Sequence, residues 1–284
     1  MKRLIMLIML VLCGLLSTES LVAQYYSWGV DPPAYRWRQM KAEDYRVVYP
    51  DTAQPIANRM MYYLDAVQKD ISYGYRHPQM YIPFVVHPVN FRSNGMVMWM
   101  PRRVEFLSTP EIRGYSMPWT KQLVAHEYRH AVQYNNLNRG IVKALSYVIG
   151  QQSSTIGLLF MPLWMMEGDA VMTETEMSTF GRGLQPSFTM AYRAYGNVAD
   201  VYKYTDKWFC GSYKDYIPDH YAIGYLMSRH TYNRFDTIMG NDVSMLTTRR
   251  PYMFVSTSWI LKKLYGTNIK QLFNDTFRTL HNHW

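Results

Sequence analysis

The feature that most constrains this chain is a pair of histidines four residues apart inside a helix-forming segment. Residues 126–130 read HEYRH, which fits the pattern HExxH, and residues 121–134 contain no proline or glycine. On an α-helix, residues four apart lie one above the other on the same face. The segment therefore predicts a helix that presents the imidazoles of His126 and His130 to one cation, with Glu127 beside them.

This arrangement is typical of zinc sites that hydrolyse amide bonds. Catalytic zinc takes three protein ligands, with neutral imidazole nitrogens at about 2.0–2.1 Å, and keeps one position open for a water. The zinc charge lowers the pKa of that water, and a neighbouring glutamate accepts its proton. We therefore expect His126 and His130 to be ligands and Glu127 to be the general base. The competing interpretation is a solvated helix that carries two unrelated histidines.

A third ligand is required, and the chain offers a glutamate on a later predicted helix. The extended motif HExxHxxGxxH would need glycine and histidine where the chain has Gln133 and Asn136. Glu167 lies in the sequence LWMMEGDA at 163–170, where burial of a carboxylate is costly unless it is paired or binds a metal. We expect Glu167 to be the third ligand. Glu174 follows two helical turns later on the same face and is expected to orient a ligand imidazole.

The first 23 residues have the pattern of a secretory signal peptide. Lys2 and Arg3 precede an apolar stretch at 4–16, and Ala23 provides a small residue for cleavage. The apolar stretch is shorter than the roughly 18 residues that a membrane-spanning helix needs. We therefore predict export to the periplasm, the outer envelope or the medium.

Composition limits the class of protein further. Of the 284 residues, 48% are hydrophobic and 18% are charged, which excludes wholesale disorder and supports a substantial core. The net charge is +9, but the basic residues do not form a recognisable nucleic-acid-binding module. We therefore expect no nucleic-acid partner. The positive charge is compatible with association with an anionic envelope surface.

The order of the predicted elements favours an α+β fold. Strand patterns occur at 45–49, 81–87, 96–100 and 102–107, and a helix is expected from about 51 to 70. Long helical segments then dominate, at 119–136, 139–150, 161–179, 217–233 and 268–281, with a loop at 180–187. Within a mature domain 24–284, we expect residues 24–136 to form a sheet subdomain that contains the motif helix. Residues 137–284 would form a helical subdomain, with the active site between the two.

The two metal motifs together resemble those of the gluzincin metallopeptidases, the peptidase MA-like group that includes thermolysin and aminopeptidase N. In this group HExxH is followed by W-x-x-E-G on a later helix, and the chain has WMMEG at 164–168. The resemblance implies a zincin-like fold with one zinc ion per chain. It also implies that His126, His130 and Glu167 hold the zinc and that Glu127 is the general base.

A third motif extends the resemblance to aminopeptidase-N-like enzymes. These enzymes carry Tyr-x-x-Gly at the start of a later helix, and the tyrosine stabilises the tetrahedral oxyanion. Residues 221–224 read YAIG, which is similar in spacing and character. The resemblance therefore implies Tyr221 as the oxyanion donor, with His220 and Tyr225 as alternatives.

One departure from aminopeptidase N concerns the substrate. The signature Gly-Ala-Met-Glu-Asn, which binds the amino terminus of a substrate, is absent, and GMVMW stands at 95–99. We therefore expect an endopeptidase rather than an aminopeptidase. The resemblance to gluzincins also implies that residues 96–100 form a strand at the edge of the cleft and hold an extended peptide by strand addition. Domains of this kind often precede further repeats, so the resemblance allows for C-terminal domains in a longer protein.

The leading hypothesis is an exported zinc metallopeptidase that acts on a peptide or protein substrate. The alternative is a catalytically silent binding or scaffold domain of a larger envelope protein. Glu127 argues against this alternative, because a structural zinc fills its fourth position and needs no base. Amide hydrolysis of a cell-wall component is a further alternative.

Overall fold

The computed structural model describes residues 31–112, 117–153, 161–196, 206–249 and 256–284. The chain divides into two compact units, Met1–Arg36 and Trp37–Trp284. The predicted signal peptide, residues 1–23, lies outside the described residues. In the described part of the first unit, the backbone N–H of Tyr35 donates to the carbonyl of Pro32 at 3.1 Å and closes a turn. Within the described ranges, no helix is both long and apolar enough to cross a membrane.

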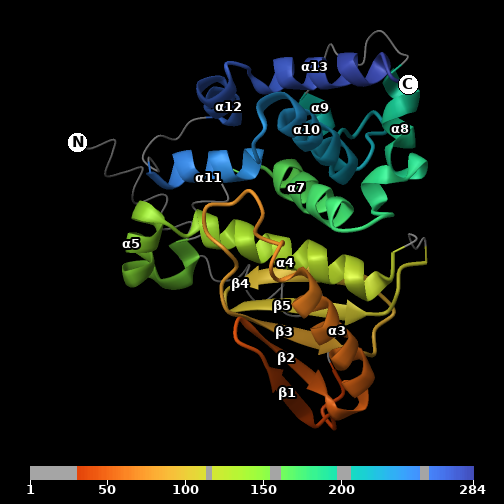
Figure 1. Ribbon diagram of the computed structural model, residues 1–284, viewed down its shortest axis with the longest axis vertical. Coiled ribbons are helices and arrows are strands. Elements are labelled where there is room, and N and C mark those ends of the chain that lie inside the picture. The colour runs from red at the N-terminus through yellow and green to blue at the C-terminus, as the bar shows by residue number, and fades with distance from the viewer. Residues whose placement is uncertain (1–30, 113–116, 154–160, 197–205, 250–255) are drawn as a thin grey trace. The chain divides into compact units, whose positions relative to one another are not determined.

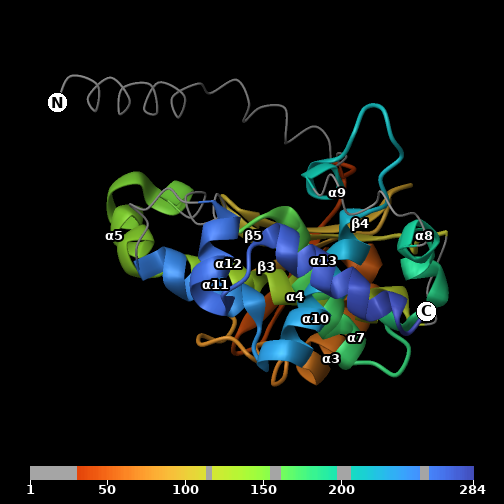
Figure 2. The ribbon, with the colours of Figure 1, turned by 90° about the horizontal axis from the view of Figure 1, so that it is seen from above.

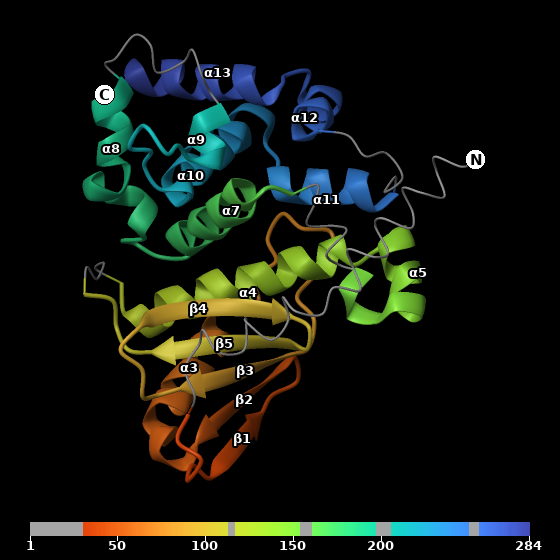
Figure 3. The ribbon, with the colours of Figure 1, turned by 180° about the vertical axis from the view of Figure 1, so that it is seen from behind.

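The second unit begins with a five-stranded mixed sheet (Figures 1 and 3). The strands are β1 (Trp37–Lys41), β2 (Tyr45–Pro50), β3 (Ile82–His87), β4 (Ser93–Trp99) and β5 (Arg102–Ser108). Their order is β1-β2-β3-β5-β4, with parallel pairing of β2 with β3 and of β3 with β5. The edge strands β1 and β4 pair antiparallel with their neighbours. Strand β1 is not predicted by the sequence, because WRQMK is mostly exposed and lacks alternation.

Two helices cover one face of this sheet. The short helix η1 (Asp51–Ala53) leads into α3 (Gln54–Val67), and α3 and α4 (Trp119–Leu137) both lie behind the sheet in Figure 3. Alternate residues of β2 and β3 point to these helices and are buried, as the twofold period of a strand requires. On α4, the Tyr128 ring lies edge-on to Phe84 at 5.5 Å between centroids, which anchors the motif helix to the sheet.

The elements that the structure describes after β5 are all helices, so the predicted α+β class is confirmed at this level. After α4, these helices are α5 (Gly140–Ile149), η2 (Gly150–Ser153), α7 (Leu163–Glu176), η3 (Arg182–Leu184), α8 (Pro186–Gly196), α9 (Asp206–Cys210), α10 (His220–Phe235), α11 (Met239–Arg249), α12 (Thr257–Tyr265) and α13 (Ile269–His281). The loop predicted at 180–187 is only partly correct, because it contains η3 and the first turn of α8. Pro186 suggests a loop in the sequence, but proline is also favoured in the first turn of a helix.

Helices α7 and α10 lie side by side in Figures 1 and 2 and cross with their backbones in contact. A Cβ atom on Gly168 would lie 2.1 Å from the carbonyl carbon of Gly224. A Cβ atom on Gly224 would lie 2.0 Å from the carbonyl oxygen of Trp164. Gly168 follows Glu167 directly, and Gly224 lies one turn after Tyr221. The crossing therefore determines how closely these two side chains approach each other.

The close crossing gives a stability prediction for Gly224→Ala. Alanine is normally favoured over glycine in a helix interior by about 0.5–1 kcal/mol. Here the added methyl group meets backbone that cannot move aside, so we expect destabilisation by about 1–3 kcal/mol or more. Chemical denaturation monitored by circular dichroism measures the change. Asn233→Ala, at an exposed position of the same helix, is the control and should change stability by no more than about 0.5 kcal/mol. A Gly224→Ala protein as stable as the wild type would contradict the packing argument.

Candidate metal centre

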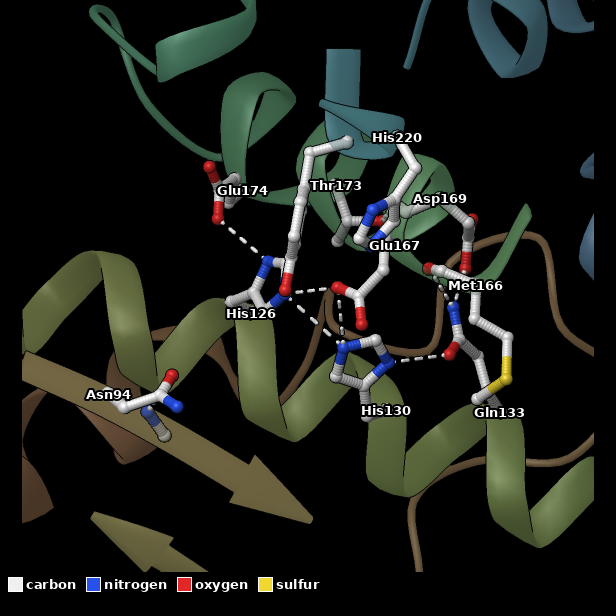
Figure 4. A network of polar contacts seen from close by, with 12 residues as sticks. Asn94, His126, His130, Gln133, Met166, Glu167, Asp169, Thr173, Glu174 and His220 are labelled. Carbon is white, nitrogen blue, oxygen red and sulfur yellow. Dashed lines mark hydrogen bonds and ion pairs between the residues drawn. The ribbon is translucent and has the colours of Figure 1, made fainter. Parts of the chain in front are cut away.

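The structure brings the three predicted ligands together between α4 and α7 (Figure 4). Nε2 of His126 lies 3.0 Å from Oε2 of Glu167, and Nε2 of His130 lies 3.3 Å from the same oxygen. The two Nε2 atoms are 3.2 Å apart. All three side chains are buried. Helical spacing on α4 aligns the imidazoles, and the packing of α7 on α4 brings the carboxylate to them.

These separations fit a tetrahedral cation. For bonds of about 2.0–2.1 Å, the ligand atoms of a tetrahedral zinc site are about 3.3–3.4 Å apart. The observed separations of 3.0–3.3 Å are close to this value. Two imidazoles and one carboxylate are three ligands, the number that catalytic zinc sites take from the protein. The donor set and its spacing therefore fit a small divalent ion.

The outer nitrogen of His126 is held by charged groups. Its Nδ1 atom lies 3.0 Å from Oε2 of Glu174 and 2.8 Å from Nη2 of Arg182. Arg182, on η3, also pairs with Glu174, which is fully buried. The structure thus places the Glu174 carboxylate behind the imidazole of His126. When Nδ1–H donates to the carboxylate, the lone pair of Nε2 is free for a metal.

The outer nitrogen of His130 is held by a neutral amide. Nδ1 of His130 lies 2.7 Å from Oε1 of Gln133. The amide nitrogen of Gln133 donates to the carbonyl of Met166 at 2.9 Å and to Oδ2 of Asp169 at 2.7 Å. Because both acceptors face the NH2 group, the amide oxygen is turned to the imidazole, and Nδ1 must donate. This selects the tautomer with a free Nε2 lone pair.

A buried ion pair between Arg129 and Asp169 supports this amide. Nε of Arg129 donates to Oδ2 of Asp169 at 2.9 Å, and Nη2 donates to Oδ1 at 2.8 Å. Nη1 of Arg129 donates to the carbonyls of Ile71 and Tyr73. The guanidinium also stacks on the ring of Tyr75, 4.5 Å from its centroid. Arg129 thus points away from the ligand atoms and ties α4 to α7.

Glu127 lies against the edge strand β4. A Cβ atom on Gly95 would lie 2.7 Å from Cγ and 2.8 Å from Oε1 of Glu127, so a side chain at this position would require the carboxylate to move. Burial raises the pKa of Glu127, while the nearby His130 and His126 lower it in part. The carboxylate is therefore a stronger base than an exposed glutamate.

Among the three predicted oxyanion donors, Tyr221 lies beside the ligands. Its ring centroid is 5.9 Å from that of His126, and the Arg182 guanidinium lies 5.2 Å from the centroid of the Tyr221 ring. Burial raises the pKa of Tyr221 well above its usual value, and the charges of Glu167 and Glu127 add to the effect. Tyr225 instead contacts Phe188, and His220 stacks on Tyr221.

The charges of the site leave room for a divalent cation. Counted as formal charges, Glu127, Glu167 and Glu174 contribute −3 and Arg182 contributes +1, which gives −2, while Arg129 and Asp169 neutralise each other. Without a bound cation, this negative charge favours the protonated form of the two imidazoles. Burial alone would lower the pKa of His130, but the charge of Glu167 and its hydrogen bond raise it to about 9. The pKa of His126 is raised in the same way by its bonds to Glu167 and Glu174.

Three residues near the predicted ligands are not assigned a role by the sequence: Gly95, Arg129 and Arg182. Gln133 is mentioned there only for excluding a longer motif. Its position three residues after His130 places it on the same helix face, a signal that spacing could have given. Arg182 comes from a segment predicted to be a loop, and its contact with Glu174 depends on tertiary structure.

Comparison with known proteins finds a distant structural similarity. The chain is similar to a crystal structure of an aminopeptidase N family protein from Idiomarina loihiensis, with 14% sequence identity and a TM-score of 0.48. The match covers 86% of this chain, which spans 46% of the length of that protein. No protein-family model matches the sequence. No curated protein matches it either.

The buried ion pair gives a stability prediction for Asp169→Ala. Removing this carboxylate leaves Arg129 buried without its charge partner, so we expect a loss of about 3–5 kcal/mol in the free energy of unfolding. Asp275→Ala is the matched control, because it removes an ion pair with Arg234 that is partly exposed, and it should cost less than about 1 kcal/mol. Urea denaturation of both variants compares the two pairs. Equal losses of unfolding free energy in the two variants would contradict the claim that the buried pair stabilises the fold more than the exposed pair.

Proposed function

We propose that this chain is a zinc-dependent metallopeptidase that hydrolyses internal bonds of a peptide or protein. The observation that carries the proposal is the set of three buried ligand atoms, 3.0–3.3 Å apart, on two helices. His126, His130 and Glu167 would hold the ion. Zinc, when bound in such a site, polarises a carbonyl and lowers the pKa of a water.

Glu127 is proposed to move the proton in this reaction. It accepts a proton from the attacking water and transfers it to the nitrogen of the leaving amine. Burial supports this role, because it raises the pKa of the carboxyl towards the pH at which the enzyme would work. The lack of a side chain at Gly95 leaves room for the carboxylate at the edge of the sheet, where a bound peptide would lie.

Tyr221 is proposed to stabilise the developing oxyanion. Its raised pKa keeps the phenol protonated, so that it can donate a hydrogen bond to negative charge. The contact of Arg182 with the Tyr221 ring limits the rotation of this side chain. The backbone crossing at Gly168 and Gly224 fixes the distance between the helices that carry Glu167 and Tyr221.

Strand β4 is proposed to bind the substrate as an added strand. It is an edge strand, and the outer edge of such a strand presents backbone N–H and C=O groups to a partner. The sequence GMVMW at 95–99 contains no carboxylate to pair with a free amino terminus. This favours cleavage within a peptide chain. The N-terminal pattern at 1–23 supports a location outside the cytoplasm, where the substrate would also be found.

The proposal predicts different outcomes for two single substitutions. Glu127→Gln removes the base but no ligand, so zinc should remain bound at one ion per chain while hydrolysis of a mixed peptide library falls at least 1,000-fold, an order-of-magnitude expectation. Glu167→Ala removes a ligand and should abolish both zinc binding and hydrolysis. Elemental analysis and mass spectrometry of the digested library measure the two properties. A chelator should inactivate the wild type.

Glu176→Gln is the matched control, because this acid is on the same helix as Glu167 but is exposed and pairs with Arg229. It should keep both zinc and activity. Full hydrolysis by Glu127→Gln would refute the mechanism, and a wild type that binds zinc without cleaving any peptide would favour the scaffold alternative.

Gly95→Ala tests the position of the base. The new methyl group would overlap Glu127 and displace its carboxylate, so we expect kcat to fall by about 100-fold without loss of zinc. Met96→Ala, on the opposite face of the same strand, should affect KM more than kcat. Steady-state kinetics on one cleaved peptide separate these effects. An unchanged kcat in Gly95→Ala would show that the room left by Gly95 does not determine the position of the Glu127 carboxylate.

A further inference from the structure

Helix α5 is an apolar helix that exposes most of its side chains. Its sequence is GIVKALSYVI, and it is located beyond the C-terminal end of α4 and beside α11 (Figures 1 and 3). Tyr147 and Val148 are 81% and 82% exposed, and Ile141 and Ile149 are 44% and 41% exposed. Val142 is the one residue of the helix that is buried. This surface, defined by the four exposed residues, is called the α5 surface.

Basic residues border the α5 surface. Lys143 precedes Tyr147 by four positions and therefore lies on the same helix face. Arg139 directly precedes the helix, and Arg249 ends α11 where that helix meets Gly140. The sequence contains no Asp or Glu between 128 and 166. The α5 surface is thus apolar with a positive rim and has no acid within the segment that forms it.

An apolar surface with a positive rim fits a lipid surface better than it fits a second protein chain. A helix of 10 residues is about 15 Å long, whereas a stable protein interface buries about 800 Å² per partner from 20–30 residues. Four exposed large apolar side chains on such a helix are too few for a stable dimer. Interfacial helices combine an apolar face with Lys or Arg, and the cations attract anionic headgroups.

The exposure also argues against a role as a wall of the metal centre. Residues that wall a site contact the groups that line it, but Tyr147 and Val148 are more than four-fifths exposed. Helix α5 packs on α11, and Gly140 at its start abuts the carbonyl of Thr248. The surface is therefore free to meet a partner outside the molecule.

We propose that the α5 surface docks the protein onto an anionic phospholipid bilayer. Tyr147, Val148, Ile141 and Ile149 enter the boundary between headgroups and acyl chains, and Lys143, Arg139 and Arg249 contact the phosphates. The helix lies in the plane of the membrane surface and does not cross it. This docking does not depend on zinc or on peptide hydrolysis.

Hydrogen exchange with mass spectrometry of the full chain tests the proposal locally. Vesicles of phosphatidylglycerol should slow exchange of residues 140–150 severalfold, whereas phosphatidylcholine vesicles should have little effect. The double variant Tyr147→Ser/Val148→Ser should lose this protection and still fold, because both side chains are exposed. Lys143→Glu should lower the affinity for phosphatidylglycerol vesicles, measured by sedimentation, by more than about fivefold. Loss of one cation near an anionic surface costs about 1 kcal/mol, which is roughly fivefold in affinity, and the new negative charge adds to this loss.

Ile112→Ser and Tyr213→Ser are matched controls, since both replace fully exposed apolar residues elsewhere, and they should keep the protection. All variants share the same N-terminal segment, so any lipid binding by residues 1–23 is equal among them. Unchanged exchange of 140–150 with phosphatidylglycerol, or full protection in the double variant, would overturn the proposal. A wild-type protein that is dimeric without lipid, with a monomeric double variant, would assign the α5 surface to a second copy of the chain and would also overturn the proposal.

Discussion

The buried charge pairing between α4 and α7 is the constraint on which the rest of the structure depends. Arg129 and Asp169 are 1% and 2% exposed, and either charge alone would be costly at that depth. Arg129 immediately precedes His130, and Asp169 follows Glu167 by two residues. A shift of one helix along the other would break the ion pair as well as separate the predicted ligands. The pair therefore sets the register in which the ligand atoms meet.

The fold could be predicted from the sequence where a pattern is strong and local. Residues 119–136 and 161–179 are predicted as helices and are observed as α4 and α7. The first segment contains no proline or glycine, and the second has Pro162 at its start, where proline is tolerated. Helix α11 is not predicted, because MGNDVSMLTTR mixes polar and β-branched residues and is stabilised by its buried Met239 and Val243 rather than by its own pattern. Such an element follows from tertiary packing, which a local pattern does not contain.

The candidate site divides in the same way. Helical spacing brings His126 and His130 onto one face of α4, and the cost of an unpaired buried carboxylate singles out Glu167. The structure brings the three side chains together. The roles of Arg182 and Asp169 depend on contacts between segments 40 or more residues apart, such as Arg129 with Asp169 and Arg182 with His126. The charge of Arg182 and of Asp169 predicts that each needs a partner of opposite charge. Which residue is that partner depends on the register of α4 and α7, which the sequence does not give.

The two imidazoles are supported differently, and the charge of the site explains why. A carboxylate behind a ligand imidazole makes it a stronger donor, which is the position of Glu174 behind His126. A second carboxylate in direct contact with His130 would bring the site to −3, more than a divalent ion balances. Gln133 instead orients His130 without adding charge, and Asp169 behind it is neutralised by Arg129. The neutral amide therefore allows both imidazoles to be oriented while the site keeps the charge that one divalent cation can offset.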